Sequence, residues 1–158
     1  MTNASKTENA RDDLAAVNQL SRAECLKLLS TEHLGRLAVA GPAPAPIIRP
    51  INYVFDAHTQ SVVFRSVEGS KFHRLVRETH AAFEVDGRDE ATRTAWSVIV
   101  IGVTEEVNRA HELRWLETLP LDSWVLPRGE GHWMRIRAWT VSGRRIGTGQ
   151  PWAPDPGA

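Results

Sequence analysis

The sequence predicts a mainly β fold, an antiparallel β-barrel with short helices packed against it. Several short segments rich in β-branched and aromatic residues are separated by Gly, Pro and Asp, which is typical of strands joined by turns. Two or three short amphipathic segments lie between them, without the regular strand–helix alternation of a parallel sheet and without an internal repeat. The 158 residues fit one domain.

The first half of the domain opens with a short helix. Ser21 and Glu24 have the spacing of a capping box, in which each side chain satisfies a backbone N–H group at a helix start, and the helix is expected to end near residue 30 or 31. Pro50 marks an edge or a bulge, because proline removes a ladder donor. Strands are predicted at 36–40, 47–55 and 61–66, with a hairpin loop at 56–60.

The second half begins with a turn at 67–70 and a helix from Lys71 to about Glu78. Phe72, Leu75 and Val76 have i, i+3, i+4 spacing, so one face of this helix is expected to pack on the barrel. The remaining predicted elements are strands at 81–85, 96–107 and 133–146 and a helix at 111–119.

Composition restricts the class of protein. Residues 1–17 are polar and 148–158 are rich in Gly and Pro, so both are expected to be tails around a domain spanning 18–147. Lys plus Arg and Asp plus Glu both number 19, so no net charge favours nucleic acid or a membrane surface. No apolar run is long enough for a membrane span and no signal peptide is visible, which predicts a cytoplasmic protein. The one cysteine, Cys25, is expected to be buried.

The segment from Phe64 to Lys71 carries the most chemistry. Ser66 and Ser70 offer hydroxyl groups, and Gly69 lets the backbone approach a ligand. Together with the cations Arg65 and Lys71 and the first N–H groups of a helix, they suit a phosphate. A capped helix after a hairpin, with solvated cations, explains the same residues, and both interpretations are open. The spacings of a P-loop and of a dinucleotide-binding Gly motif are absent.

Six short motifs follow one another in a recognisable order. They are 34–39 (LGRLAV), 49–53 (RPINY), 63–66 (VFRS) followed by 69–71 (GSK), 83–86 (FEVD), 96–98 (WSV) and 141–146 (VSGRRI). In order and spacing they resemble the pyridoxamine 5′-phosphate oxidase-like FMN-binding split-barrel superfamily, and most closely its branch of small uncharacterised bacterial proteins. The resemblance covers roughly residues 20 to 147.

The resemblance implies a six-stranded antiparallel Greek-key split barrel that forms a homodimer and holds FMN at the dimer interface. Arg65, Ser66, Ser70 and Lys71 would then bind the phosphate, and the strand around Pro50 would run along the isoalloxazine ring. The segment 96–98 would approach the flavin, from the partner subunit if not from the same chain. The full set of cofactor-binding residues expected from the resemblance is Arg49, Pro50, Ile51, Asn52, Phe64, Arg65, Ser66, Gly69, Ser70, Lys71, Trp96, Ser97 and Val98.

The expected function is that of an FMN-dependent oxidoreductase acting on an unknown small molecule, with no catalytic side chain assigned. The alternatives are a deazaflavin- or haem-binding split barrel, a flavin carrier or sensor without turnover, and a nucleic-acid-binding barrel. The last rests on the basic run from Arg135 to Arg145, interleaved with Trp133 and Trp139. An outward strand face with salt bridges is the favoured explanation of that run.

Histidines are expected to play a minor part. No HxxxH or CxxC pair occurs, so no metal site is predicted, and His73, His80, His111 and His132 are set aside. His73 and Tyr53 are expected near the flavin ring, where they would shape a substrate pocket.

Overall fold

The computed structural model describes residues 17–41, 45–67, 70–77, 79–122, 127 and 130–147, with the side chains of residues 71, 74 and 75 outside that set. Residues 1–16 and 148–158 also lie outside it, so the two tails remain predictions. Val17 differs from the expectation, because it begins a short strand and pairs with Ile146. Within the described part of the chain, no helix has the length and apolar character needed to cross a membrane.

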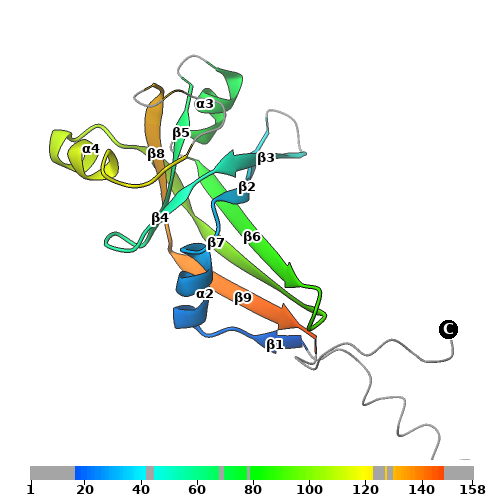
Figure 1. Ribbon diagram of the computed structural model, residues 1–158. Coiled ribbons are helices and arrows are strands. Elements are labelled where there is room, and N and C mark those ends of the chain that lie inside the picture. The colour runs from blue at the N-terminus through cyan, green and yellow to red at the C-terminus, as the bar shows by residue number, and fades with distance from the viewer. Residues whose placement is uncertain are drawn as a thin grey trace, which may run out of the picture.

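The described residues form nine strands and three helices (Figure 1). In chain order they are β1 (Val17–Gln19), α2 (Arg22–Leu29), β2 (Leu34–Ala40), β3 (Pro46–Asn52), β4 (Val54–Asp56), β5 (Ser61–Ser66), α3 (Lys71–Val76), β6 (His80–Asp89), β7 (Thr94–Glu106), α4 (Ala110–Leu116), β8 (His132–Arg137) and β9 (Thr140–Ile146).

The strands form one curled antiparallel sheet in the order β3-β2-β6-β7-β8-β5-β4, and β9 joins β7 to β1. Strand β7 has a special place in it. Its first part lies between β6 and β9, whereas Thr104 to Glu106 pair with β8. The chain therefore turns from one side of the barrel to the other within a single strand, and the predicted antiparallel barrel is confirmed.

The strand count exceeds the predicted six, partly because two predicted strands are each divided. The segment 47–55 breaks at Tyr53 rather than at Pro50, and 133–146 breaks at 138–139, where the chain passes from β8 to β9. The Tyr53 side chain is 1% exposed, and its hydroxyl donates a 2.8 Å hydrogen bond to the Leu29 carbonyl of α2. Burial raises the pKa of Tyr53 far above its ordinary value. Tyr53 is a core residue, so the expectation that it lines a substrate pocket is wrong.

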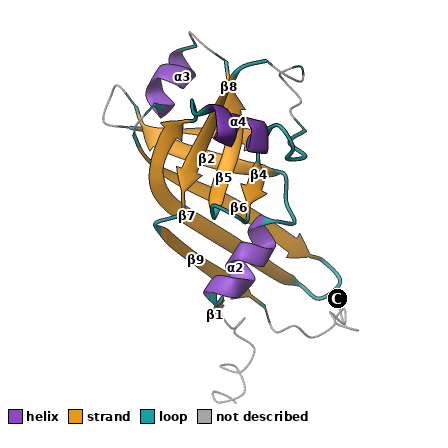
Figure 2. Ribbon diagram, turned by 90° about the vertical axis from the view of Figure 1, so that its left-hand side faces the viewer, coloured by secondary structure: helices purple, strands orange, loops and turns teal. Residues whose placement is uncertain are grey.

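Helix α2 covers one end of the barrel, and α3 and α4 lie toward the other (Figure 2). The predicted capping box of α2 is confirmed, since the Ser21 hydroxyl accepts from the Glu24 N–H and the Glu24 carboxylate accepts from the Ser21 N–H. Cys25 is fully buried against the core, as expected, and desolvation raises the pKa of its thiol. The main core inside the barrel includes Leu37, Phe64 and Phe83.

Ion pairs hold α4 against β8. Arg135, only 7% exposed, donates a 2.6 Å hydrogen bond to Glu112 of α4 and also binds Glu105 of β7. Arg137 donates a 2.7 Å hydrogen bond to the same Glu105. The favoured explanation of the basic run, a strand face with salt bridges, is therefore confirmed for these two arginines.

Replacing Gly102 with alanine tests the turn of β7. A Cβ at this position would lie 2.1 Å from the Arg137 carbonyl oxygen and 2.9 Å from the Ile136 side chain. Because a backbone oxygen cannot move aside cheaply, Gly102→Ala should lower the free energy of unfolding by about 1–3 kcal/mol. Urea denaturation measures this, and an unchanged midpoint would show that β7 and β8 do not approach as described.

The Glu112–Arg135 pair predicts a pH-dependent contribution to stability. The hydrogen bond from Arg135 lowers the pKa of Glu112 below its ordinary value. The stabilisation is therefore present above the ordinary carboxyl pKa and is lost as the pH falls through the lowered one. Glu112→Gln should cost about 1 kcal/mol or less at pH 7, and the two proteins should converge at acid pH, once the carboxyl group is protonated in the folded protein as well. Urea titrations across this range that gave a constant difference would contradict this assignment.

Candidate functional site

Two strands leave unpaired edges where the barrel is split. Strand β5 pairs with β4 through residues 61–63 only: Ser61 lies opposite Asp56 and Val63 opposite Val54. Residues 64–66 of β5 therefore extend beyond β4. Strand β3 is the first strand of the sheet and, of the strands that the structure describes, pairs with β2 alone. Strand β3 also contacts β5. If the register of the β4–β5 pair continued back into β3, Asn52 would lie opposite Arg65. The structure thus brings together two of the predicted groups, Arg49–Asn52 and Phe64–Ser66, which we call the split edge.

The β3 side of the split edge offers backbone groups and one cation. Pro50 is tolerated because β3 is an edge strand. Ile51 packs against the core, whereas the Arg49 side chain is exposed and donates to the carbonyl of the adjacent Ile48. Among the described residues Arg49 makes no ion pair, so its charge is available to an anion. Asn52 is half-buried.

The β5 side contributes a buried hydroxyl group. Ser66 is 4% exposed, and its Oγ has no hydrogen-bond partner among the residues that the structure describes. Side chains alternate along a strand, so Ser66 shares a face with Phe64, which is fully buried in the barrel core. An unpaired hydroxyl in such a place costs free energy unless a ligand completes it. Ser66 therefore fits a group that brings its own hydrogen-bonding atoms.

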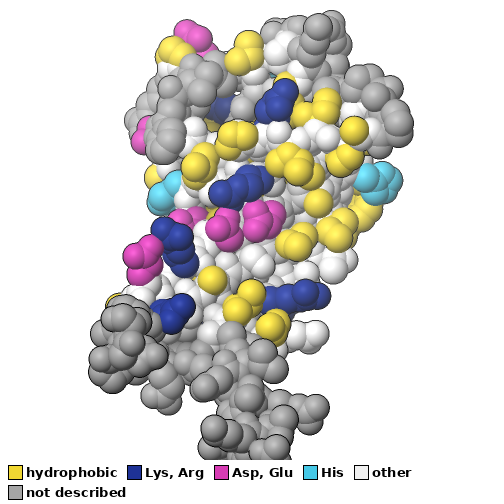
Figure 3. Space-filling model, turned by 90° about the vertical axis from the view of Figure 1, so that its right-hand side faces the viewer, with side chains coloured by type: hydrophobic (Ala, Val, Ile, Leu, Met, Phe, Trp, Pro, Cys, Tyr) yellow, Lys and Arg dark blue, Asp and Glu magenta, His cyan; other side chains and the backbone are white. Residues whose placement is uncertain are grey.

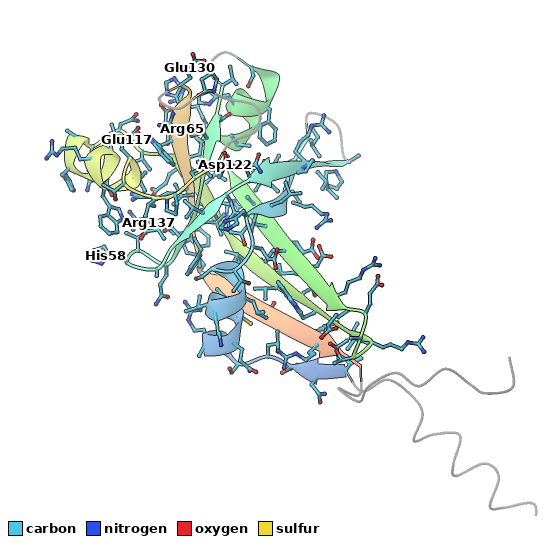
Figure 4. The ribbon with its side chains drawn as sticks, viewed as in Figure 1. His58, Arg65, Glu117, Asp122, Glu130 and Arg137 are labelled. Carbon is cyan, nitrogen blue, oxygen red and sulfur yellow. The ribbon has the colours of Figure 1, made fainter. Side chains whose placement is uncertain are left out.

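Arg65 faces the opposite side of β5 (Figure 4). Its guanidinium donates 2.6 Å hydrogen bonds to the Glu117 carboxylate and to the Glu130 carbonyl, and it stacks 4.3 Å from the centre of the Trp133 ring. The same carboxylate accepts from the Trp133 indole N–H at 2.8 Å. Strand alternation separates Arg65 from Ser66, which the sequence analysis had grouped. The role of Arg65 in this structure is to hold the α4 end against the barrel.

The turn between β5 and α3 is only partly described. Ser70 caps α3: its hydroxyl donates to the Val67 carbonyl at 2.9 Å and accepts from the His73 N–H at 2.9 Å. A ligand that uses this hydroxyl must therefore replace one of the two contacts. Gly69 and the Lys71 side chain lie outside the described residues, and their phosphate role stays a prediction.

The third predicted group, Trp96, Ser97 and Val98, lies far from Ser66 and three strands away from the β3 side of the split edge within one chain. It sits near the start of β7, whereas Glu106, which pairs with the β8 strand beside Ser66, lies at the end. Nine residues of extended strand measure up to about 30 Å. Val98 is fully buried, and Trp96 packs over Gly87 of β6. Within one chain these residues are therefore separated from the β5 side of the split edge by most of the length of β7.

A cluster that the sequence analysis missed lies at the same end of the barrel as Ser66. His73 of α3, Glu106 of β7 and His132 of β8 offer ligand atoms that all lie within 4.8 Å of one another. No HxxxH spacing marks this cluster, because the three residues are distant in sequence. The antiparallel pairing of β7 and β8 sets Glu106 opposite Met134, two residues from His132, so a prediction of that register would have brought Glu106 and His132 together.

A further cavity of about 360 Å³ lies between α4 and the β4–β5 hairpin. His58 and Trp115, whose rings are 5.8 Å apart, line it together with Arg135. None of the predicted site residues lines this cavity.

Known proteins share both the sequence pattern and the fold. Residues 21–145 match the pyridoxamine 5′-phosphate oxidase family. An FAD binding protein from Mycobacterium smegmatis is 32% identical, with a TM-score of 0.71 over 83% of this chain and 99% of that one. A putative pyridoxamine 5′-phosphate oxidase from Corynebacterium glutamicum is 28% identical, with a TM-score of 0.69 over 85% and 96%.

An uncharacterised protein of Mycobacterium tuberculosis is 34% identical over 115 residues, which are 69% of this chain and 72% of that protein. The resemblance stated from the six motifs is thus confirmed over most of the chain, together with the split-barrel fold it implied. The chain belongs to the pyridoxamine 5′-phosphate oxidase family.

Proposed function

We propose that this chain binds a flavin nucleotide at the split edge, works as a homodimer and passes electrons or a hydride between the flavin and a small molecule. The observation that carries the proposal is the buried Ser66 hydroxyl, which lies beside the unpaired edges of β3 and β5 and has no partner within the described part of the chain. It is supported by the similar Mycobacterium smegmatis structure, which is described as an FAD binding protein.

The split edge suits the two ends of a flavin nucleotide. The ring system is flat and apolar with a polar pyrimidine edge, so it needs an apolar wall and backbone hydrogen-bonding groups. The strand from Pro50 to Asn52 provides both, since Ile51 faces the core and the outer edge of β3 is unpaired. The phosphate needs cations and hydroxyl groups, for which we propose Ser66, Arg49 and Lys71.

FMN is the first candidate for the flavin, because the sequence motifs resemble those of an FMN-binding superfamily. The relative described as an FAD binding protein makes FAD the second candidate. Denaturing the purified protein and identifying the released flavin by mass spectrometry decides between them. In either case the bound flavin supplies the redox chemistry at its ring, and the chain's own residues bind and orient it.

We propose that the dimer forms through the outer face of the sheet. Cross-strand pairing aligns Ile48, Ala38, Ala82 and Ile101 in one apolar row across β3, β2, β6 and β7. Ile48 is 57% exposed and Ile101 is 47% exposed, and such a row is typical of an interface. Figure 3 shows hydrophobic side chains on either side of a band of charged side chains on one face of the molecule. By strand alternation, the Arg36–Asp86 ion pair of β2 and β6 lies on the same face of the sheet as the row.

A dimer of this kind explains the separation of the site residues. Strand β7 forms part of the outer face, and by strand alternation Ser97 faces the same way as Ile101, whereas Trp96 packs against the core. Pairing two copies through this face offers a route by which residues 96–98 of one chain approach the split edge of the other. The flavin would then stabilise the dimer, because it binds only where two chains meet.

Substitutions on the two faces of β5 test the flavin site. Ser66→Ala and Lys71→Ala should each weaken flavin binding by about 10-fold or more, since a hydrogen bond to a charged group contributes about 1.5–3 kcal/mol. Arg65→Gln is the control, because its side chain is held by Glu117 on the other face, and the dissociation constant should change by less than about threefold. Quenching of flavin fluorescence measures all three. Equal losses in all three variants would contradict the assignment.

The purified protein itself separates the alternative cofactors and roles. A yellow protein with flavin absorbance that reduced nicotinamides bleach supports the oxidoreductase. A Soret band indicates haem, binding of only the deazaflavin coenzyme indicates that branch, and a bound flavin that no reductant of this class reduces indicates a carrier or sensor. A colourless protein that binds none of these, and no FMN or FAD, would refute the proposal.

Placing a charge in the apolar row tests the dimer. Ile101→Asp should convert the protein to a monomer and weaken flavin binding at the same time, because both depend on the second copy. Val17→Asp is the matched control, since Val17 is 61% exposed on β1 and lies outside the row. Light scattering after size-exclusion chromatography gives the mass. A wild-type monomer, or an Ile101→Asp dimer with unchanged affinity for flavin, would be the contrary outcome.

A further inference from the structure

We propose that His73, Glu106 and His132 form a binding site for one divalent transition-metal ion of the zinc type, at the barrel end covered by α3. This barrel-end cluster is separate from the residues proposed to hold the flavin, and the proposal does not depend on the flavin. Two imidazoles and one carboxylate are a donor set that zinc accepts in proteins, and three protein ligands leave a fourth position open.

The fold brings the three side chains to one face. Glu106 pairs with Met134, and side chains two positions apart on a strand point to the same side, so His132 lies on the inner face with Met134. The His132 Nδ1 atom is 2.6 Å from one carboxylate oxygen of Glu106. Helix α3 places the His73 ring 5.0 Å from the His132 ring. A hydrogen bond holds the end of α3 against β7, because the Thr104 hydroxyl of β7 donates to the Val76 carbonyl of α3.

The distances are close to those of a metal site. The His73 Nε2 atom lies 3.9 Å from the second Glu106 oxygen, and the three ligand atoms lie within 4.8 Å of one another. Around a tetrahedral ion with bonds of about 2.0–2.2 Å, neighbouring ligand atoms are roughly 3.4 Å apart. An ion therefore requires the Glu106–His132 contact to open slightly and the His73 ring to move inward by about 1 Å, which rotation of these side chains provides.

Burial and charge favour an ion at this position. The side chains of His73 and Glu106 are 6% and 13% exposed, and that of His132 is 32% exposed. Among the described residues the buried Nδ1 atom of His73 has no hydrogen-bond partner, so it does not hold the ring against the small rotation that would bring Nε2 to an ion. The one cation that contacts the cluster among the described residues is Arg77, whose Nε lies 3.3 Å from Glu106. Its side chain is 55% exposed and can turn into solvent when an ion replaces it.

The open position determines what such an ion would take as a further ligand. Ser66 and His132 are directly paired across β5 and β8, so the unpartnered Ser66 hydroxyl lies on the same side of the barrel as the cluster. Besides water, the chemical class that suits this position is an anionic oxygen ligand such as a phosphate. The competing explanation is a purely structural network in which Glu106 accepts from His132 and Arg77, and that network binds no metal.

Metal titration of the untagged, full-length chain tests the proposal. Co²⁺, followed by its visible absorption bands, and Zn²⁺, followed by calorimetry and by metal analysis after dialysis, should each bind with one ion per chain. Bound Zn²⁺ should also raise the melting temperature, and a chelator should reverse the rise. Flavin content is measured on the same samples, so a failure of the metal site and a failure of the flavin proposal are seen separately.

Single substitutions assign the ligands. His73→Ala, Glu106→Gln and His132→Ala should each weaken Zn²⁺ binding by roughly 100-fold or more, because loss of a direct ligand costs at least as much as loss of a supporting hydrogen bond to one. His111→Ala is the matched control: this histidine is exposed on α4 and away from the cluster, and its removal should leave the affinity unchanged. Circular dichroism without metal shows that each variant is folded, and Glu106→Gln keeps the shape of the side chain.

Two results would overturn the proposal. The first is wild-type protein that takes up less than about a tenth of an equivalent of Zn²⁺ after dialysis and shows no Co²⁺ bands. The second is metal binding that survives all three substitutions or is lost equally in His111→Ala, which would show that ions bind to surface histidines instead.

Discussion

Strand β7 pairs with strands on both sides of the barrel, and this pairing determines where residues 96–98 and Glu106 lie. Its start is enclosed by β6 and β9 and carries Trp96 and Ser97, whereas its end pairs with β8 and carries Glu106. The strand can change sides because Gly102 lets the backbone of β8 approach where any side chain would collide. Within a chain, β7 thus separates residues 96–98 from the β5 side of the split edge, and the proposed dimer would bring these residues of a second copy to the site.

The alternation of side chains along β5 is the second constraint. Phe64 and Ser66 face the barrel interior, and Arg65 faces α4, where Glu117 neutralises it. The serine and basic residues that are adjacent in sequence therefore lie on two faces, with Ser66 on the face proposed to meet the flavin and Arg65 on the face that binds α4. The interior face of the same strand end also borders the barrel-end cluster, since Ser66 pairs with His132. Both proposed ligand sites therefore lie at this end, where the edges of β3 and β5 are unpaired and α3 packs.

Local signals predicted much of the fold. The capping box fixed the start of α2, and the apolar run at 61–66 gave β5 its bounds, because both depend on residues adjacent in sequence. The breaks at Tyr53 and at 138–139 were not predictable, since tertiary contacts cause them: the Tyr53 hydroxyl binds α2, and the chain at 138–139 passes between two sides of the barrel. The direction of Arg65 and the approach of Glu106 to two histidines likewise depend on strand register, which the sequence does not show.

The central claim is that the flavin lies between β3 and β5, and amide hydrogen exchange with and without flavin tests it most directly. Peptides covering residues 49–52 and 64–71 should exchange more slowly when FMN or FAD is added, because ligand contacts protect the unpaired strand edges. Peptides from α4 should be unchanged. Protection confined to α4 and the β4–β5 hairpin, which enclose the other cavity, would contradict the account.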